Sequence, residues 1–330
     1  MPELSRILAA LAAAPGQPAA LATLVGVEGS SYRRPGARLL LLADGTRLGS
    51  ISGGCLEDDV VLRAQRVLAT GRPELATYDT TAENDLVWGV GTGCQGVVRI
   101  FLEPIPVIRP PWIKVLAENL RARRDTALVV VHGGDQPTGT QLAAGEPTPS
   151  DGAVFRETIF APPAVFIFGA GDDAQTLVRL AKDTGWHVTV ADSRPAYAMA
   201  ARFPLADAVV AAPAAQLTDV LPLDARSFAV MMTHRYSDDL LLLRALLPLP
   251  LPYLGVLGPR KRTDRLLAEL QRNGLVVVDA MRARLHAPVG LDLGGRTPEE
   301  VALSILAEMH CRRENRLPGH LRDRPGPIHG

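Results

Sequence analysis

The sequence predicts an α/β protein of two domains: a mixed α/β domain over residues 1–160, followed by a Rossmann-like, doubly wound parallel-sheet domain over residues 161–330. Apolar strand patterns alternate with helical patterns through the second half, as in doubly wound sheets. A glycine-rich turn joins the first of these strands to a helix. Pro162 and Pro163 interrupt regular pairing just before that strand, and 330 residues suffice for about two domains.

Composition excludes several classes of function. Lys and Arg number 35 and Asp and Glu number 35, so the formal net charge is zero and no overall basic surface points to nucleic acid. The 3 cysteines are too few, and odd in number, for a disulfide framework, which favours a reducing compartment. The most apolar window, residues 240–258, is cut by Arg244 and by prolines, so it cannot cross a bilayer as one helix. We therefore expect a cytoplasmic protein with no membrane partner.

The first half reads as short strands and helices joined by turns. Asp44-Gly45 fits the two-residue hairpin turn that demands positive φ, so the apolar runs on either side are expected to pair. Apolar positions recur with a helical period from Cys55 onward, and Gly71 suits the position just beyond that helix. Strands are expected over 20–27, 38–43, 46–51, 74–80, 97–102 and 127–131, and helices over the N-terminal run, from Cys55 and over 113–124.

The first candidate site is the stretch 49–59, GSISGGCLEDD, where a short apolar strand runs into Ser52, Gly53, Gly54 and Cys55. Glycines let backbone N–H groups converge on an anion, and a helix N-terminus adds a partial positive charge. A thiol in the first turn of that helix would have its thiolate stabilised, as a nucleophile or soft-metal ligand. The alternative is a small cysteine buried under the helix, and the sequence leaves both interpretations open.

A second cysteine lies in the glycine-dense stretch 88–96, which contains Gly93 and Cys94. The spacing from Cys55 is 94 − 55 = 39 residues with no CxxC element, so a zinc knuckle has little support. Two thiols on glycine-rich turns suggest a shared role more strongly than either alone. Nearby arginines are candidates for phosphate binding, although loop arginines are usually just solvated: Arg33, Arg34 and Arg38.

The second half carries a dinucleotide-fold fingerprint. The strand 164–168 is followed by GAGDDA, in which Gly169 and Gly171 are the first two glycines of the G-x-G-x-x-A pattern. Asp192 ends the next strand 192 − 171 = 21 residues later, where a ribose-binding acid belongs. Further strands are expected over 187–191, 207–211, 228–233 and 253–257, and a capping box at 297–300 is expected to start a helix over 301–309.

The fingerprint predicts the fold and leaves open whether the fold binds a nucleotide. Asp172 and Asp173 occupy the first turn of the helix, where they either repel a pyrophosphate or favour the helix dipole. His234 follows a parallel strand at its carboxyl end, which faces the ligand crevice of such sheets, or it merely belongs to a capping turn. The basic turn 260–265 either holds an anion or is a solvated face. A nucleotide crevice would contain Gly169, Gly171, Asp192 and His234.

Several long motifs, in a fixed order along the chain, resemble those of a known family. In the first half these are EGSSYRRPGARLLL, GSISGGCLEDDV and GTGCQG. In the second they are PPAVFIFGAGDDAQTLVRLAKDTGWHVTVADSRPAYA, MTHRYSDDL, YLGVLGPRKRTDRLL and LHAPVGLDLGGRTPEEVALSILAEM. Over nearly its whole length the chain resembles the XdhC/CoxI family, the xanthine dehydrogenase accessory proteins.

The resemblance implies a cytoplasmic chaperone rather than a turnover enzyme. Such a protein binds the molybdenum cofactor, protects it, helps it acquire its terminal sulfur with a cysteine desulfurase, and delivers it to a xanthine dehydrogenase-like or carbon monoxide dehydrogenase-like enzyme. On this model Cys55 and Cys94 handle the cofactor, with their thiolates near molybdenum. A homodimer is also expected from the resemblance.

Two alternatives stay open. The fingerprint around Gly169 and Asp192 is typical of an NAD(P)-dependent oxidoreductase, although apart from His234 no second group suited to acid–base chemistry stands out. The basic turn 260–265 instead suggests a non-catalytic scaffold that binds an adenine nucleotide and regulates release of a cargo or partner.

Overall fold

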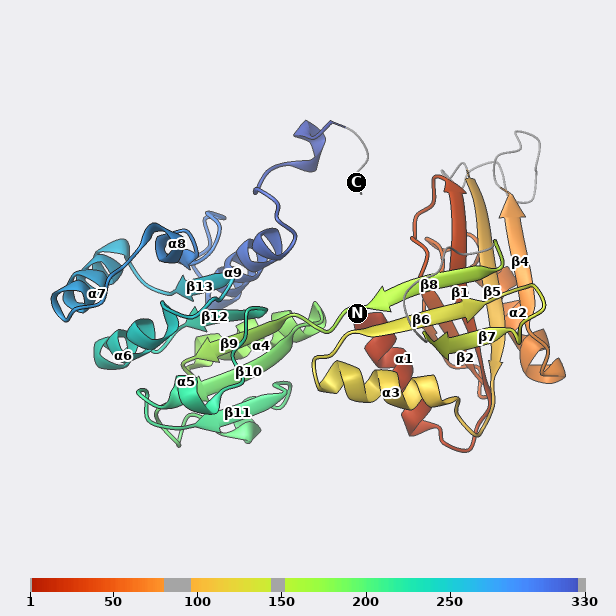
Figure 1. Cartoon of the computed structure of the whole chain (residues 1–330), viewed down its shortest axis with the longest axis horizontal. Coiled ribbons are helices and arrows are strands. Elements are labelled where there is room, and N and C mark those ends of the chain that lie inside the picture. The colour runs from red at the N-terminus through yellow and green to blue at the C-terminus, as the bar shows by residue number, and fades with distance from the viewer. Residues whose placement is uncertain (1, 80–95, 144–151, 326–330) are drawn as a thin grey trace. The chain divides into compact units, whose positions relative to one another are not determined.

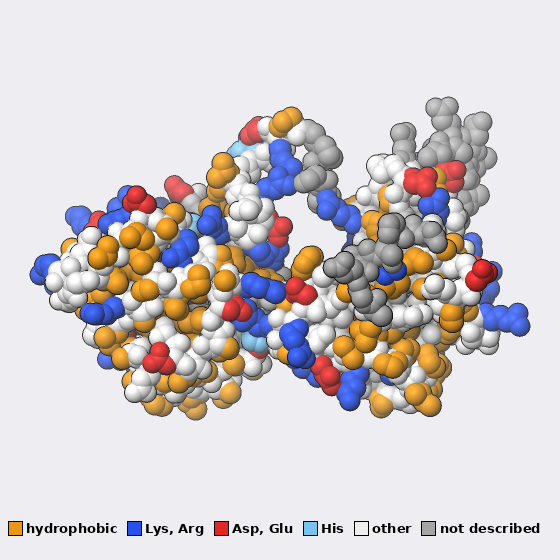
Figure 2. Space-filling view, in the orientation of Figure 1, with side chains coloured by type: hydrophobic (Ala, Val, Ile, Leu, Met, Phe, Trp, Pro, Cys, Tyr) orange, Lys and Arg blue, Asp and Glu red, His pale blue; other side chains and the backbone are white. Residues whose placement is uncertain are grey.

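The protein is described by a computed structural model, which describes residues 2–79, 96–143 and 152–325 (Figure 1). The chain divides into two compact units, Met1–Ala161 and Pro162–Gly330. Within the described ranges, no helix is long and apolar enough to cross a membrane. On the face shown in Figure 2, acidic and basic side chains are intermixed with apolar ones.

The described part of the first unit contains two antiparallel sheets. A five-stranded sheet has the order β3-β2-β1-β5-β4, and a three-stranded sheet has the order β7-β6-β8. The predicted hairpin is present, and Gly45 has the positive φ of 87° that its turn requires. The strands are β1 (Ala19–Gly29), β2 (Arg38–Leu42), β3 (Arg47–Gly49), β4 (Glu74–Asp79), β5 (Gly96–Ile105), β6 (Thr126–Val131), β7 (Gly139–Leu142) and β8 (Val154–Ile159).

Both faces of the larger sheet are buried at β2 and along most of β1, which explains the uninterrupted apolar runs of these strands. Successive side chains of a strand point to opposite faces. Leu39 and Leu41 of β2 therefore join the cluster under α2 (Glu57–Thr70), while Leu40 and Leu42 join the cluster under two other helices. These helices are α1 (Pro2–Ala13) and α3 (Pro111–Arg121).

The described part of the second unit contains a parallel six-stranded sheet of order β11-β10-β9-β12-β13-β14. The order runs outward from β9 in one direction and from β12 in the other, which confirms the predicted doubly wound, Rossmann-like sheet. Its strands are β9 (Ala164–Phe168), β10 (His187–Asp192), β11 (Ala208–Ala211), β12 (Ser227–Met231), β13 (Tyr253–Val256) and β14 (Leu285–His286).

Helices cover both faces of this sheet. One face packs against α4 (Asp172–Asp183) and α9 (Pro298–Arg313), and the opposite face packs against α5 (Leu217–Val220), α6 (Tyr236–Leu246) and α7 (Arg260–Arg272). The predicted capping box starts α9, because Thr297 and Glu300 bond each other's backbone N–H groups. The short helices are η1 (Ala200–Arg202), α8 (Asp279–Arg282) and η2 (Leu321–Asp323).

Candidate functional site

In the first unit, the turn between β3 and α2 is organised by Ser52, which is only 5% exposed. Its hydroxyl oxygen accepts hydrogen bonds from the backbone N–H groups of Gly54 (3.2 Å) and Leu56 (3.1 Å). The same hydroxyl donates to the carboxylate of Glu57. The turn is therefore held by a buried side chain, and its backbone N–H groups do not all face solvent.

Glu57 closes this turn from the other side. Its carboxylate accepts hydrogen bonds from the backbone N–H of Ser52 (2.8 Å) and the hydroxyl of Ser50 (2.9 Å). Burial acts to raise the pKa of Glu57, but the hydrogen bonds from Ser52 and Ser50 outweigh burial and leave the pKa below its usual value. The carboxylate is therefore ionised at neutral pH and stays a hydrogen-bond acceptor.

Cys55 lies at the outer side of this turn and is exposed. The prediction that helix α2 begins at Cys55 is wrong, because the first helical residue is Glu57 and Leu56 is the N-cap. The alternative of a cysteine buried under the helix is also wrong. Leu56, at 3% exposure, occupies that buried position, and Ser52 accepts the Leu56 N–H. The thiol contacts Ser52 Oγ at 3.5 Å and otherwise presents its sulfur to solvent.

Tyr32 is the aromatic side chain next to this turn, and sequence reasoning did not single it out. A Cβ placed on Gly53 would lie 3.3 Å from the Tyr32 ring, so the ring covers the backbone of Gly53. The ring is nonetheless 69% exposed. Its position inside the motif EGSSYRRPGAR, which was singled out for its arginines, is the signal that could have identified it.

The three predicted arginines have different environments. Arg38 is 3% exposed and forms an ion pair with Glu157, which ties β2 to β8 and leaves its guanidinium out of reach of solvent. Arg33 pairs with Glu3 of α1 at 2.8 Å. Arg34 is exposed. Of the three, Arg34 is therefore the one best placed to meet an anion from solvent.

Gly93 and Cys94 lie outside the described residues. The described chain resumes at Gly96, which pairs with Gly29 of β1. A Cβ on Gly96 would lie 2.4 Å from the Glu28 carbonyl oxygen and 2.8 Å from the Ser30 carbonyl oxygen, so glycine is required for this close approach. Across the described ranges, no group of three or more His, Cys, Asp or Glu side chains is arranged to hold a metal ion.

A second candidate site lies at the reversal of strand order in the second unit. Gly169 follows β9 with a φ of +117°, and a Cβ there would lie 2.4 Å from the carbonyl oxygen of Met232, which follows β12. Only glycine fits, since the backbones of the two strand ends touch. Gly171 is the N-cap of α4 and provides no side-chain cap. The turn thus lies at the carboxyl ends of the strands, where sheets of this kind bind ligands.

Asp192 is buried at the end of β10, at 4% exposure. One carboxylate oxygen accepts from the backbone N–H (2.8 Å) and Nε (2.9 Å) of Arg194, and the other from the Ala170 N–H (2.7 Å) and Arg194 Nη2 (2.8 Å). Burial acts to raise the pKa of Asp192, but the bonds from Arg194 and Ala170 hold the pKa below its usual value. The ionised Asp192 carboxylate therefore forms an ion pair with Arg194.

His234 follows β12 in the left-handed region, with a φ of 58°. Its Nε2 lies 2.8 Å from a carboxylate oxygen of Asp173, in the first turn of α4. Asp172, the neighbouring acid, pairs with Arg202 at 2.7 Å. The two acids that follow the glycine turn are thus paired with cationic or ionisable side chains. The four predicted crevice residues all lie at the carboxyl ends of β9, β10 and β12.

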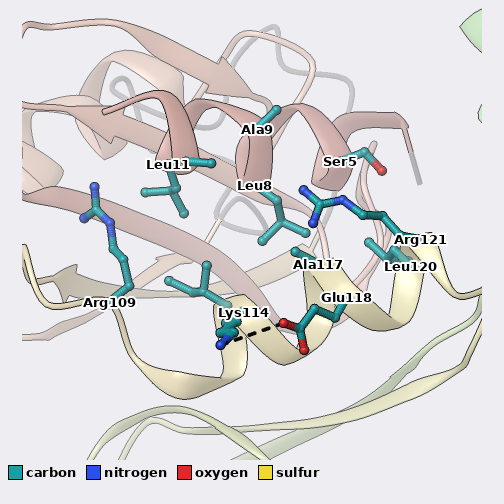
Figure 3. Close-up of a pocket in the computed structure, with 12 residues that line it drawn as sticks. Ser5, Leu8, Ala9, Leu11, Arg109, Lys114, Ala117, Glu118, Leu120 and Arg121 are labelled. Atoms are coloured by element: carbon teal, nitrogen blue, oxygen red, sulfur yellow. Dashed lines mark ion pairs between the residues drawn. The ribbon is translucent and has the colours of Figure 1, made fainter. Parts of the chain in front are cut away.

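A separate apolar groove of about 560 Å³ lies between α1 and α3 in the first unit (Figure 3). Leu8, Leu11 and Leu120 form part of its wall, and Lys114 lies 3.9 Å from Glu118 at its edge. Sequence analysis predicted none of these as site residues. Among the residues that line the groove, Ser5 has the one hydroxyl and Glu118 the one carboxylate.

Comparison with known proteins covers both units. A family model described as the XdhC Rossmann domain matches residues 165–309, and one described as the XdhC and CoxI family matches residues 12–79. The chain is 33% identical over 318 residues to a protein of Bacillus subtilis named as a probable subunit of xanthine dehydrogenase, covering 88% of this chain and 92% of that protein.

Two further likenesses extend over most of the chain. It is 25% identical to the molybdenum cofactor insertion chaperone PaoD of Escherichia coli, over 92% of this chain and 87% of that one. A crystal structure described as a xanthine dehydrogenase from Bacillus halodurans superimposes with a TM-score of 0.80 at 31% identity, covering 96% of this chain and 97% of that one. The likeness therefore spans both candidate sites.

Proposed function

Because the chain belongs to the XdhC and CoxI family, we propose that it is an accessory protein of molybdoenzyme maturation that carries the molybdenum cofactor as cargo. The observation that carries this proposal is similarity over most of the chain to a relative named as a molybdenum cofactor insertion chaperone. The protein holds and transfers its cargo and does not turn over a substrate.

The cargo site of this proposal is the turn that bears Cys55. The cofactor offers a soft metal–sulfur centre, a flat pterin ring and a phosphate. The exposed Cys55 sulfur suits the metal–sulfur centre, because soft ligands bind soft metal centres. The exposed Tyr32 ring offers a face on which the pterin can stack, and the exposed Arg34 offers a cation for the phosphate. A Cβ on Gly54 would meet nothing within 4 Å, so the surface beside Cys55 is open there, while the Tyr32 ring covers Gly53.

The turn positions the thiol without a metal. Ser52 and Glu57 hold the backbone on both sides of Cys55 through buried or half-buried hydrogen bonds. A thiol held in one place loses little further conformational freedom when it binds, which favours affinity. Cys94 belongs to the proposal as a second thiol, on the strength of its glycine-rich sequence alone.

The proposal extends to partners. A cysteine desulfurase would supply the terminal sulfur of the cofactor, and a xanthine dehydrogenase-like or carbon monoxide dehydrogenase-like enzyme would receive it. A homodimer is part of the same proposal. Support for the recipient class comes from relatives named for xanthine dehydrogenase and for cofactor insertion.

The test is cofactor retention. The protein is co-expressed with an active cofactor pathway and purified anaerobically, and molybdenum and released pterin are measured for wild type, Cys55→Ala, Cys94→Ala and the double variant. We expect near-stoichiometric cofactor in the wild type and loss of most of it in the double variant. Cys311→Ala, which changes a partly exposed cysteine of α9, is the matched control and should retain the cargo.

Two outcomes would contradict the proposal. An empty wild type, under conditions where a known carrier fills, removes the cargo function. Full retention in both single variants and in the double variant would instead remove the thiols from the site. A recipient apoenzyme incubated with the loaded protein provides the second readout, because activation of that enzyme requires transfer and not binding alone.

A further inference from the structure

Asp192, at the carboxyl end of β10 in the second unit, differs from the ribose-binding acid of dinucleotide folds. In dinucleotide folds an acid at the end of the second strand accepts hydrogen bonds from the ribose hydroxyls, whereas a nearby arginine accommodates a 2′-phosphate. Asp192 occupies the acid position, yet each of its oxygens already accepts two hydrogen bonds from the protein. A carboxylate has about four acceptor sites. Asp192 therefore has no acceptor site left for a ribose diol.

Arg194 presents a cation at the same place. Its Nε and Nη2 bind Asp192, and the Arg194 side chain is 29% exposed, so Nη1 is the guanidinium nitrogen left to meet a ligand. The guanidinium lies 3.8 Å from the centre of the Tyr197 ring, and Arg202 lies 5.0 Å from that ring centre. Tyr197 is 41% exposed. Stacking on Tyr197 fixes the plane of the Arg194 guanidinium, which favours directed binding of an oxyanion.

A second arginine faces the same corner. Arg235, the N-cap of α6, is 47% exposed in its side chain and reaches Ser193 Oγ at 3.4 Å and Asp238 at 3.5 Å. Both contacts are long, while Ser193 donates a normal 2.7 Å hydrogen bond to Asp238. Arg235 can therefore turn toward an anion at small cost, and Ser193 keeps Asp238 satisfied.

The acids of the first turn of α4 each have a side-chain partner. Asp172 is paired with Arg202, and Asp173 lies 2.8 Å from His234 Nε2. Arg202 therefore reduces the repulsion between Asp172 and a pyrophosphate, which is one of the two effects that the sequence left open for these acids. Gly171, the N-cap of α4, provides no side-chain cap, and the Ala174 N–H donates to the Asp173 carboxylate at 3.0 Å. The N-terminus of this helix is where dinucleotide folds bind a pyrophosphate.

We propose that this crevice binds an adenine nucleotide bearing a 2′-phosphate, of the NADP type, in preference to its unphosphorylated counterpart. The 2′-phosphate would meet Arg194 and Arg235 where an NAD-binding protein offers a free carboxylate. This ligand is separate from the cofactor cargo of the first unit. The proposal concerns binding and includes no hydride transfer.

NADPH and NADH provide a matched pair of probes, because they differ only in the 2′-phosphate. We expect titration of full-length protein, prepared without the molybdenum cofactor pathway, to show NADPH fluorescence changes with at least about tenfold tighter affinity than NADH. 2′,5′-ADP should displace NADPH better than 5′-ADP does. Since no cargo is present, failure here leaves the cargo proposal untouched.

Single substitutions test which arginines cause the preference for NADPH over NADH. Arg235→Ala should weaken NADPH about tenfold and leave NADH unchanged. Arg194→Ala should weaken NADPH and, because it frees Asp192 to accept ribose hydroxyls, should not weaken NADH. Arg244→Ala, at an exposed arginine in the last turn of α6, is the control and should change neither affinity.

Three results would overturn the proposal: equal affinities for NADPH and NADH, tighter binding of NADH, or binding of neither at about 1 mM. Loss of NADPH binding in Arg194→Ala counts only if the variant unfolds at the wild-type temperature. Arg235→Ala, whose side chain is more exposed and lies outside the Asp192 network, keeps the test decisive if Arg194→Ala fails to fold.

Discussion

Each unit contains a strand, a glycine-rich turn and a helix, and the two turns are built on different principles. The turn at Ser52 is closed by residues within 50–57, since Ser52, Ser50 and Glu57 satisfy one another. The turn at Gly169 is defined by contact with Met232, far along the chain. A local network can therefore present one reactive side chain, whereas a ligand site at the edge of a sheet needs several strand ends together.

The largest expected effect tests the long-range turn. Gly169→Ala places a Cβ 2.4 Å from a backbone oxygen at a φ of +117°, so we expect it to lower the free energy of unfolding of the second unit by about 3 kcal/mol or more. Gly171→Ala is the control, because its Cβ would approach only the movable Asp173 carboxylate. Denaturant unfolding measures both, and equal losses would show that backbone contact does not define this turn.

The next effect tests the local turn. Ser52→Ala leaves the N–H groups of Gly54 and Leu56 without their acceptor and removes a donor to Glu57, so a loss of about 1–3 kcal/mol is expected. Ser50→Ala removes one contact to Glu57 and should cost less. Denaturant unfolding, with the alkylation rate of Cys55 as a local readout, separates the two. A Ser52→Ala protein as stable as wild type would show that the turn does not depend on this hydroxyl.

A smaller effect contrasts two buried acids. Burial raises the pKa of Glu103 above its usual value, although Thr140 donates to it, while Asp192 has a lowered pKa. A raised native pKa contributes stability below the unfolded value, about 4.3, and loses it as pH rises through the native value. A lowered native pKa contributes stability above about 3.9 and loses it as pH falls through the native value.

The two acids should therefore give opposite slopes in different pH ranges: stability falls through Asp192 as pH drops below about 3.9, and it falls through Glu103 as pH rises above about 4.3. Glu103→Gln should gain stability relative to wild type as pH rises, and Asp192→Asn should approach wild-type stability as pH falls. Parallel pH profiles for wild type and Glu103→Gln would mean that Glu103 has the same pKa in the folded and unfolded chain.

The smallest stability effect separates binding from folding. Tyr32→Ala removes a ring that is 69% exposed, so the free energy of unfolding should change by no more than about 0.5 kcal/mol. If the ring stacks on the pterin, cofactor retention should nevertheless fall. Tyr197→Ala in the second unit should leave that retention unchanged. Retention in Tyr32→Ala at the wild-type level would exclude Tyr32 from the cargo site.

Much of the fold could be predicted from local sequence patterns. The hairpin at Asp44-Gly45, the capping box at Thr297 and the parallel sheet of the second unit were predicted, because turn chemistry and apolar periodicity are encoded locally. The start of α2 was misplaced by two residues. Apolar periodicity begins at Leu56, but only the structure reveals that Ser52 accepts the Leu56 N–H and keeps Cys55 out of the helix.

The candidate sites were less predictable than the fold. Arg38 belongs to the same loop motif as Arg34, yet it pairs with Glu157, 119 residues away, and is buried. Tyr32 carries no charge or metal-binding group, so composition and spacing did not mark it. Its contact with Gly53 depends on how two loops meet, which no local pattern encodes.

By itself the sequence determined the order of elements, the glycines of both turns and the family resemblance, because these depend on neighbouring residues and on linear motifs. Only the tertiary structure decided which charges are free to act. Asp192 stands where a ribose-binding acid belongs, but the folded chain engages both of its oxygens and leaves Arg194 beside them. Long-range pairing decides such availability, since a charged group is open to a ligand only when no other part of the protein has satisfied it.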